Sequence, residues 1–236
     1  MTVFKYAFMR GIKSPMSIIV NIAIPLFLLI FLYDTQDPLE AAVGGNQNRT
    51  LFFIGMLVMY GAFVMARSIQ IDKRDGTVVR ILAGPITMRA YLIQNFLSSM
   101  IPMTVLSLII GAIGLIQHNW TIEYAGGVVL IYFFLSATSI GLSFVWSCLF
   151  KDKETSTAVL SVLITFVATL GGLMIPLRFL PDALQFIGAL FPAYWAARGL
   201  ESLMDYGMNT QFWLGILAMF LFTVAYILYG GRRRIV

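Results

Sequence analysis

Long blocks of apolar residues without Asp, Glu, Lys, Arg or His constrain this 236-residue chain more than any other feature. A helix needs about 20 mostly apolar residues to cross the roughly 30 Å of hydrocarbon in a bilayer. Only 11% of the residues are charged, whereas soluble domains have about 25%. The sequence therefore excludes a soluble enzyme, a disordered chain and a nucleic-acid-binding module, and predicts a polytopic membrane protein. Six blocks serve as candidate spans: Ser14–Tyr33, Thr50–Ala66, Ala90–Gln117, Tyr124–Phe150, Thr155–Leu177 and Tyr206–Gly231.

The positions of the basic residues predict the orientation of these spans. If the N-terminus is cytoplasmic, thirteen of the sixteen Lys and Arg residues lie on the inner side of the membrane. Cytoplasmic loops of membrane proteins carry such an excess of Lys and Arg. We therefore expect a multi-pass protein of the plasma (cytoplasmic) membrane with both termini inside, and the positive charge needs no nucleic acid to explain it.

The predicted fold is an all-α integral membrane protein with six transmembrane helices and one domain, residues 1–236. Residues 1–13 mix apolar and basic side chains, as an interfacial helix on the inner leaflet does, although an ordinary positively charged flank has the same composition. Residues 176–205 are apolar, and Pro181 and Pro192 fit the first turns of two short helices. We interpret this segment as an outer re-entrant hairpin before the last span, because an exposed loop would leave its apolar side chains in water.

The longest cytoplasmic connection covers residues 67–89. Its charged residues precede a turn at Gly76, after which Thr77 is expected to cap a short helix that ends near Leu82. Gly84 and Pro85 would end that helix. The segment is either a solvated loop of mixed charge or a docking element for a cytoplasmic partner, and the charges alone favour neither.

Two sets of residues inside the spans are candidates for pairing or transport. A stripe of small hydroxyl residues recurs every four positions in the fifth span, which suits packing within the chain, a dimer seam or the lining of a pathway. Phe and Met residues on one face of the second span could contact greasy substrates, although core packing or lipid contact explains them as well. The stripe is Thr157, Ser161, Thr165 and Thr169, and the aromatic and Met set is Phe52, Met56, Met59 and Phe63.

No catalytic or metal-binding pattern is apparent. The sequence has no HExxH, GxSxG or GxxxxGK[ST] motif and a single cysteine, Cys148. We therefore expect no enzyme activity, no metal site and no cofactor on this chain. The predicted spans also have no ionisable residue at their middle, where ion-coupled carriers usually keep one.

Residues 71–96, IDKRDGTVVRILAGPITMRAYLIQNF, resemble the type-2 ABC transporter permease family, the membrane subunits of ATP-driven exporters. The resemblance lies in Asp75-Gly76-Thr77, the pair Ile81-Leu82, Pro85 and Arg89, whereas Val79 stands where the family often has Glu. Residues 178–207 are similar to the family's outer segment in a Leu-Pro, Pro and Arg-Gly pattern. The order of spans and connections extends the resemblance over nearly the whole chain.

The resemblance implies a subunit that pairs with a second permease, identical or different, and docks an ATP-binding subunit that holds ATP and Mg. The 67–89 connection would supply the coupling helix, with the ATPase-coupling residues Asp75, Gly76, Thr77, Arg80 and Pro85. Residues 1–13 would be the family's connecting helix, and the outer hairpins would form an exit gate. A bacterial source fits this family.

The apolar spans favour a hydrophobic or amphipathic substrate such as a drug, an antimicrobial peptide or a lipid-like molecule. We also expect membrane lipid to surround the spans. Two alternatives need no ATP-binding partner. One is an ATPase-independent carrier, and the other is a membrane immunity or binding protein that moves nothing. An intramembrane enzyme fits least, because the sequence shows no nucleophile and base.

Overall fold

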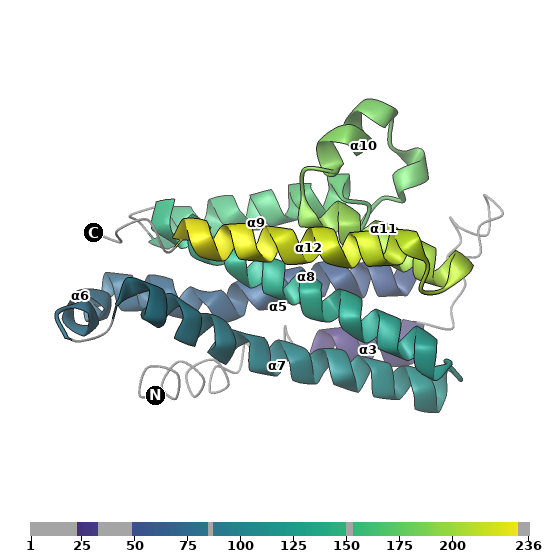
Figure 1. The fold of residues 1–236 in the computed structure, drawn as a ribbon, viewed down its shortest axis with the longest axis horizontal. Coiled ribbons are helices and arrows are strands. Elements are labelled where there is room, and N and C mark those ends of the chain that lie inside the picture. The colour runs from purple at the N-terminus through teal and green to yellow at the C-terminus, as the bar shows by residue number, and fades with distance from the viewer. Residues whose placement is uncertain (1–22, 33–48, 85–86, 150–152, 231–236) are drawn as a thin grey trace.

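The computed structural model describes residues 23–32, 49–84, 87–149 and 153–230, and every regular element within these ranges is helical. Its long helices run roughly alongside one another, and α6 lies at one end of the bundle (Figure 1). The predicted interfacial helix 1–13 and both termini lie outside the described residues. In chain order the helices are α3 (Ile24–Leu32), α5 (Arg49–Arg74), α6 (Thr77–Leu82), α7 (Met88–Gln117), α8 (Ile122–Leu149), α9 (Lys153–Leu170), the 3-10 turn η2 (Leu177–Phe179), α10 (Asp182–Gly188), α11 (Pro192–Tyr206) and α12 (Thr210–Gly230).

In the part of the chain that the structure describes, three helices are long and apolar enough to cross a membrane: α7, α8 and α12. The 21 residues of α12 extend about 31 Å at 1.5 Å per residue, which matches the hydrocarbon thickness. The apolar parts of α5 and α9, Arg49–Val64 and Ala158–Leu170, are shorter. The predicted all-helical membrane architecture is confirmed at this level, and the count of six spans stays a prediction.

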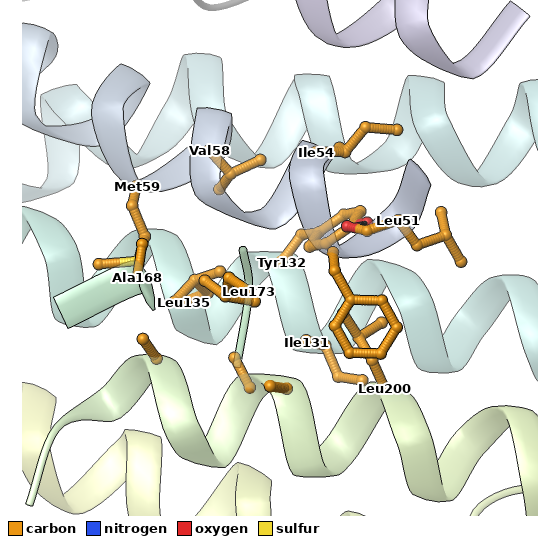
Figure 2. Packing of buried hydrophobic residues seen from close by; sticks show 14 of the residues in the cluster. Leu51, Ile54, Val58, Met59, Ile131, Tyr132, Leu135, Ala168, Leu173 and Leu200 are labelled. Carbon is orange, nitrogen blue, oxygen red and sulfur yellow. Dashed lines mark hydrogen bonds between the residues drawn. The ribbon is translucent and has the colours of Figure 1, made fainter. Parts of the chain in front are cut away.

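Helix α8 lies at the centre of the bundle, where α5, α7, α11 and α12 all pack against it. The buried Tyr132 of α8 donates a hydrogen bond to the carbonyl of Leu51 in α5 at 2.7 Å, and both side chains lie in the main hydrophobic cluster (Figure 2). The hydroxyls of the buried Ser136 and Ser139 donate to carbonyls one turn earlier in α8, at 2.7 Å each. Small hydroxyl side chains can therefore be buried in α8 because they bond to their own helix.

Three helix ends, in α5, α9 and α12, lie four or more residues from the predicted windows. α12 begins at Thr210 rather than at Tyr206, which is the last residue of α11. α5 continues beyond Ala66 to Arg74, so the predicted cytoplasmic loop 67–89 begins inside a helix. The added residues contain neither Gly nor Pro and tolerate helical conformation, so the helix persists until Gly76. α9 ends at Leu170 rather than Leu177. Two glycines follow it, and the second, Gly172, has a φ of +86°, which glycine adopts at little cost.

The segment 176–205 contains the two predicted short helices, α10 and α11. Pro181 is the N-cap residue of α10, and Pro192 is the first residue of α11, where its fixed φ suits a helix start. α11 packs against α8, α9 and α12. A Cβ at Gly171 would lie 2.5 Å from the Cβ of Ala193, so glycine is needed where α11 begins. The placement of this hairpin in the outer leaflet stays a prediction.

Candidate functional site

The connection between α5 and α7 forms a compact unit at one end of the bundle (Figure 1). Gly76 is the N-cap residue of α6 in the left-handed region, with φ 66° and no side-chain cap. The expectation that Thr77 caps this helix is therefore wrong, because the left-handed glycine makes the turn and Thr77 is already helical. Thr87 caps α7, with its hydroxyl accepting from the backbone N–H of Ala90 at 3.3 Å.

Neighbouring valines show that α6 has a buried face and an exposed face. Val78 is 1% exposed and Val79 is 64% exposed. Val78 packs in a hydrophobic cluster that includes Ala62 of α5 and Tyr91 of α7. Val78, with the partly buried Ile81 beside the same cluster, thus anchors a six-residue helix that is too short to be stable alone.

A buried hydrogen bond joins α5 directly to α7 beside this anchor. The hydroxyl of Tyr91 donates to Oδ2 of Asp72 at 2.7 Å, and Asp72 is buried. The side-chain amide of Asn95 donates to the Tyr91 carbonyl at 3.0 Å. A hydrogen bond to a charged acceptor is stronger than a neutral one. The two helices that flank α6 are therefore tied together by Asp72 and Tyr91.

The predicted ATPase-coupling residues occupy the outside of this unit. Asp75 and Arg80 are exposed, whereas Gly76 and Thr77 are half-buried. Pro85 lies outside the described residues. The structure thus brings the first four together around the start of α6, with both charged side chains accessible from outside.

Sequence reasoning missed the residues that hold α6 in place. Asp72 appeared as one member of a charged run, and no motif links it to Tyr91, which follows nineteen residues later. Val78 could have been found from the sequence. It lies on the opposite side of the six-residue α6 from the exposed Arg80.

Three members of the Phe and Met set belong to the protein core. Phe52, Met59 and Phe63 are buried in the main hydrophobic cluster, and Met56 packs against it. The structure therefore places these three side chains in the core packing that the sequence left open, and a substrate-pathway role for the set stays a prediction.

The hydroxyl stripe of α9 also makes contacts within the chain. The Tyr60 hydroxyl of α5 bonds to Thr165 and donates to the Ser161 carbonyl at 3.0 Å. Thr169 donates to the Thr165 carbonyl at 2.8 Å, and the side chain of Thr157 lies outside the described part. A dimer or pathway role for this stripe stays a prediction.

The opposite end of the bundle contains a group of charged side chains. Arg49, at the start of α5, is buried, donates to the Gly172 carbonyl at 3.2 Å and places its guanidinium carbon 4.2 Å from the Phe52 ring centroid. On α11, burial raises the pKa of Glu201, while Arg198 and Arg49 lower it and limit the shift. Within the described residues, no three His, Cys, Asp or Glu side chains form a group that could hold a metal ion.

Comparison with protein families identifies this architecture. A family model described as ABC-2 type transporter matches residues 1–205, which is most of the chain. The chain belongs to the ABC-2 type transporter family. A comparison with curated proteins gave no match.

Membership explains the arrangement of the permease. ABC-2 permeases are membrane-embedded transport components, generally not catalytic themselves, and associate with an ATP-binding subunit. The matched region includes the whole α5–α6–α7 connection and most of the hairpin, and it ends before α12. In this ABC-2 permease, the connection with its exposed charges is the strongest candidate for the contact with that subunit.

Proposed function

We propose that this permease is the membrane subunit of an ATP-driven exporter and that α6 is its coupling helix. The observation that carries the proposal is the construction of α6. Its inner face is fixed by Val78, and its outer face offers Val79 and Arg80. Asp75 is exposed in the turn before it. An exposed apolar side chain between charged ones suits a protein–protein contact with a polar rim.

Force on α6 would be transmitted to two helices at once. α6 packs on α5, and Val78 and the Asp72–Tyr91 hydrogen bond link the connection to the first turn of α7. Closure of the ATP-binding subunits would thus displace the starting turns of α7 relative to the rest of the bundle. The hairpin of α10 and α11 would form the exit gate at the other end.

A second permease, identical or different, would complete the pathway. α9 exposes large apolar side chains at Val159, Val162 and Phe166, which recur at helical spacing and form one face. We place the seam between the two permeases along this face. The substrate class that fits the apolar spans is a hydrophobic or amphipathic molecule, such as a drug, an antimicrobial peptide or a lipid-like molecule.

Cysteine crosslinking tests the coupling-helix proposal. Cys148 is the single cysteine, so V79C on a Cys148→Ser background gives one reactive thiol on the outer face of α6. The control is I116C, because Ile116 is 80% exposed at the other end of α7. In native membranes, V79C is expected to crosslink to a P-loop ATPase and I116C is not. Capture of no ATPase by V79C, with the chain purified alone, would favour an ATPase-independent carrier or a binding protein.

Charge variants test whether the contact is productive. D75N and R80Q should each weaken docking by about 1 kcal/mol, about fivefold, because exposed ion pairs contribute up to that amount. Transport should fall with the docked fraction while membrane insertion stays unchanged. Wild-type transport and wild-type ATPase co-purification in both variants would contradict the assignment.

A further inference from the structure

Helices α7, α8 and α12 border an open apolar groove of about 560 Å³. α7 and α12 each pack extensively along α8, and they hardly contact one another. The small side chain of Ala137 in α8 is part of the lining, together with Phe96 of α7 and Phe220 of α12. The volume lies within the about 300–1,000 Å³ typical of small-molecule pockets.

Among the described residues, the lining offers no free hydrogen-bond donor. The only polar side chains that these residues contribute to it are those of Thr104 and Thr223. Thr104 donates to the Met100 carbonyl at 2.8 Å, and Thr223 donates to the Met219 carbonyl at 2.9 Å. An ordered water needs about two to four polar partners. A polar ligand needs polar groups that fix its orientation. The occupant that this lining accepts is therefore apolar.

The groove lies at the depth of the bilayer hydrocarbon, because the helices that line it are the three candidate spans. On α7 the lining extends from Phe96 to Val105, about 14 Å along the helix axis. That length is close to the roughly 15 Å of hydrocarbon in one leaflet. On α12 it extends from Phe220 to Ile227, in the half nearer the end of the helix. The groove thus occupies the middle of the bundle and the side toward α6.

The size of the groove favours a thin occupant over a helix of a second copy. A helix with side chains is at least about 10 Å wide and would fill this volume within about 7 Å of its length, less than two turns. A single hydrocarbon chain is much thinner and can follow the whole groove. An empty groove would leave its lining without dispersion contacts, and lipid tails are as apolar as the lining itself.

We propose that this groove is a binding site for one acyl chain of a phospholipid in the leaflet next to α6. Arg89 is exposed in the first turn of α7, about 10 Å beyond Phe96 toward the α6 end. Its charge suits the phosphate of the same lipid, and three further arginines, 232–234, follow α12 in the sequence. The assignment of this leaflet as the inner one rests on the proposed function; the groove and its occupant do not.

The position of the bound acyl chain links its binding to the separation of two permease helices, α7 and α12. The acyl chain fills the space between α7, which directly follows the proposed coupling helix, and α12. A change in the separation of these two helices changes the shape of the groove. Lipids with different acyl chains should therefore differ in how readily they occupy it.

Photo-crosslinking in nanodiscs tests the site with the whole 236-residue chain and no partner subunit. The probe is a phosphatidylglycerol with a diazirine in its acyl chain, diluted in phosphatidylcholine, and mass spectrometry locates the labelled peptides. The test variant, V105F with V224F, fills the groove from two partly exposed lining positions. The control, L108F with L217F, places the same phenylalanine side chains at exposed positions of α7 and α12 outside the lining.

In the wild type, the label is expected to concentrate on residues that line the groove. In the groove-filling variant, labelling of these residues should fall at least about threefold. The reason is that, among equally apolar surfaces, the fit of the acyl chain to the groove decides where it binds. The control should label like the wild type. Even labelling of all lipid-facing residues, or no loss in the filled variant, would overturn the proposal. Protein–protein crosslinks at V224C between copies would overturn it in favour of a second copy. Because no transport is measured, none of these outcomes depends on the exporter proposal.

A second experiment distinguishes the contribution of the headgroup from that of the acyl chain. The same diazirine acyl chain on phosphatidylcholine should label less than on phosphatidylglycerol, and R89Q should remove that preference while groove labelling by both lipids persists. A preference that is unchanged in R89Q would overturn the place assigned to the phosphate.

Discussion

The two ends of the bundle are held together by different means. At the α6 end, a six-residue helix is fixed by the side chain of Val78 and by the hydrogen bond between Asp72 and Tyr91. At the hairpin end, backbones meet directly: a Cβ at Gly171 would lie 2.8 Å from the backbone N of Tyr194, and one at Gly215 would lie 2.8 Å from the Trp195 carbonyl oxygen. Small changes of side chain should therefore release α6, whereas the hairpin should respond to any added Cβ.

The two ends also expose different amounts of apolar surface. At the α6 end, Arg80 of α6 and Asp75 in the turn before it are exposed together with Val79. At the hairpin end, Phe186 of α10 is 77% exposed and Leu190, which follows α10, is 63% exposed, beside exposed charged residues such as Asp182. The larger apolar surface at the hairpin end suits contact with lipid or with another apolar surface.

Adding a side chain at Gly171 should give the largest effect. G171V places its Cβ 2.5 Å from the Cβ of Ala193 and 2.8 Å from its carbonyl carbon, so the hairpin must shift. We expect a loss of about 3 kcal/mol in the free energy of unfolding, seen as a lower melting temperature in detergent. G126V is the control, because only the Met208 methyl lies near that position, at 3.9 Å. Equal losses in both variants would show that the hairpin end is not held by close backbone contact.

Shortening Val78 should release α6 without unfolding the bundle. V78A removes two buried methyl groups and should cost about 2 kcal/mol, so amide hydrogen exchange in 77–82 should accelerate about thirtyfold. V79A changes an exposed neighbour and should leave exchange nearly unchanged. If V79A accelerates exchange as much as V78A, the assignment of an inner and an outer face is wrong.

Removing the Tyr91 hydroxyl should have a smaller effect at the same end. Y91F deletes a donor to the buried Asp72 and should cost about 1 kcal/mol, about fivefold in exchange near residues 72–78. Y206F removes a hydroxyl from an exposed tyrosine of α11 and serves as the control. Unchanged exchange in Y91F would mean that Val78 alone anchors the connection.

The pH dependence of the hairpin end should give the smallest effect. Burial raises the pKa of Glu201 above its ordinary 4.5, so between the two pKa values the folded state binds more protons than the unfolded state. Stability is therefore greatest below the ordinary pKa and is lost as pH rises through the folded value. E201Q should flatten this part of the melting-temperature profile, and an identical slope in wild type and E201Q would contradict the shift.

Apolar windows located the helices well and their ends poorly. Windows without charge show where a helix can enter hydrocarbon, but they cannot show how far it continues into water. α5 therefore extended to Arg74 through residues that appeared to be a loop. The hairpin helices were predictable because Pro181 and Pro192 mark helix starts locally.

The position of the candidate site in the sequence was predictable, but the contacts that hold it together were not. The resemblance located the exposed residues around Gly76, and a one-residue turn at a glycine needs only local information. The Asp72–Tyr91 hydrogen bond depends on two helices meeting, and no local pattern encodes it. The burial of Phe52, Met59 and Phe63 was equally hidden, since a single helix does not show which of its faces meets the rest of the chain.

The internal hydrogen bonds of α8 have a consequence for sliding between helices. The hydroxyls of Ser136 and Ser139 donate to carbonyls of their own helix, so these bonds stay intact when a neighbouring helix shifts along α8. Ala137, between them in the sequence, has a small side chain. It therefore presents little steric obstacle to a neighbouring helix that moves past it. α8 can therefore keep its own conformation when a neighbouring helix moves past Ser136 and Ser139, whereas movement of α5 would have to break the Tyr132–Leu51 hydrogen bond.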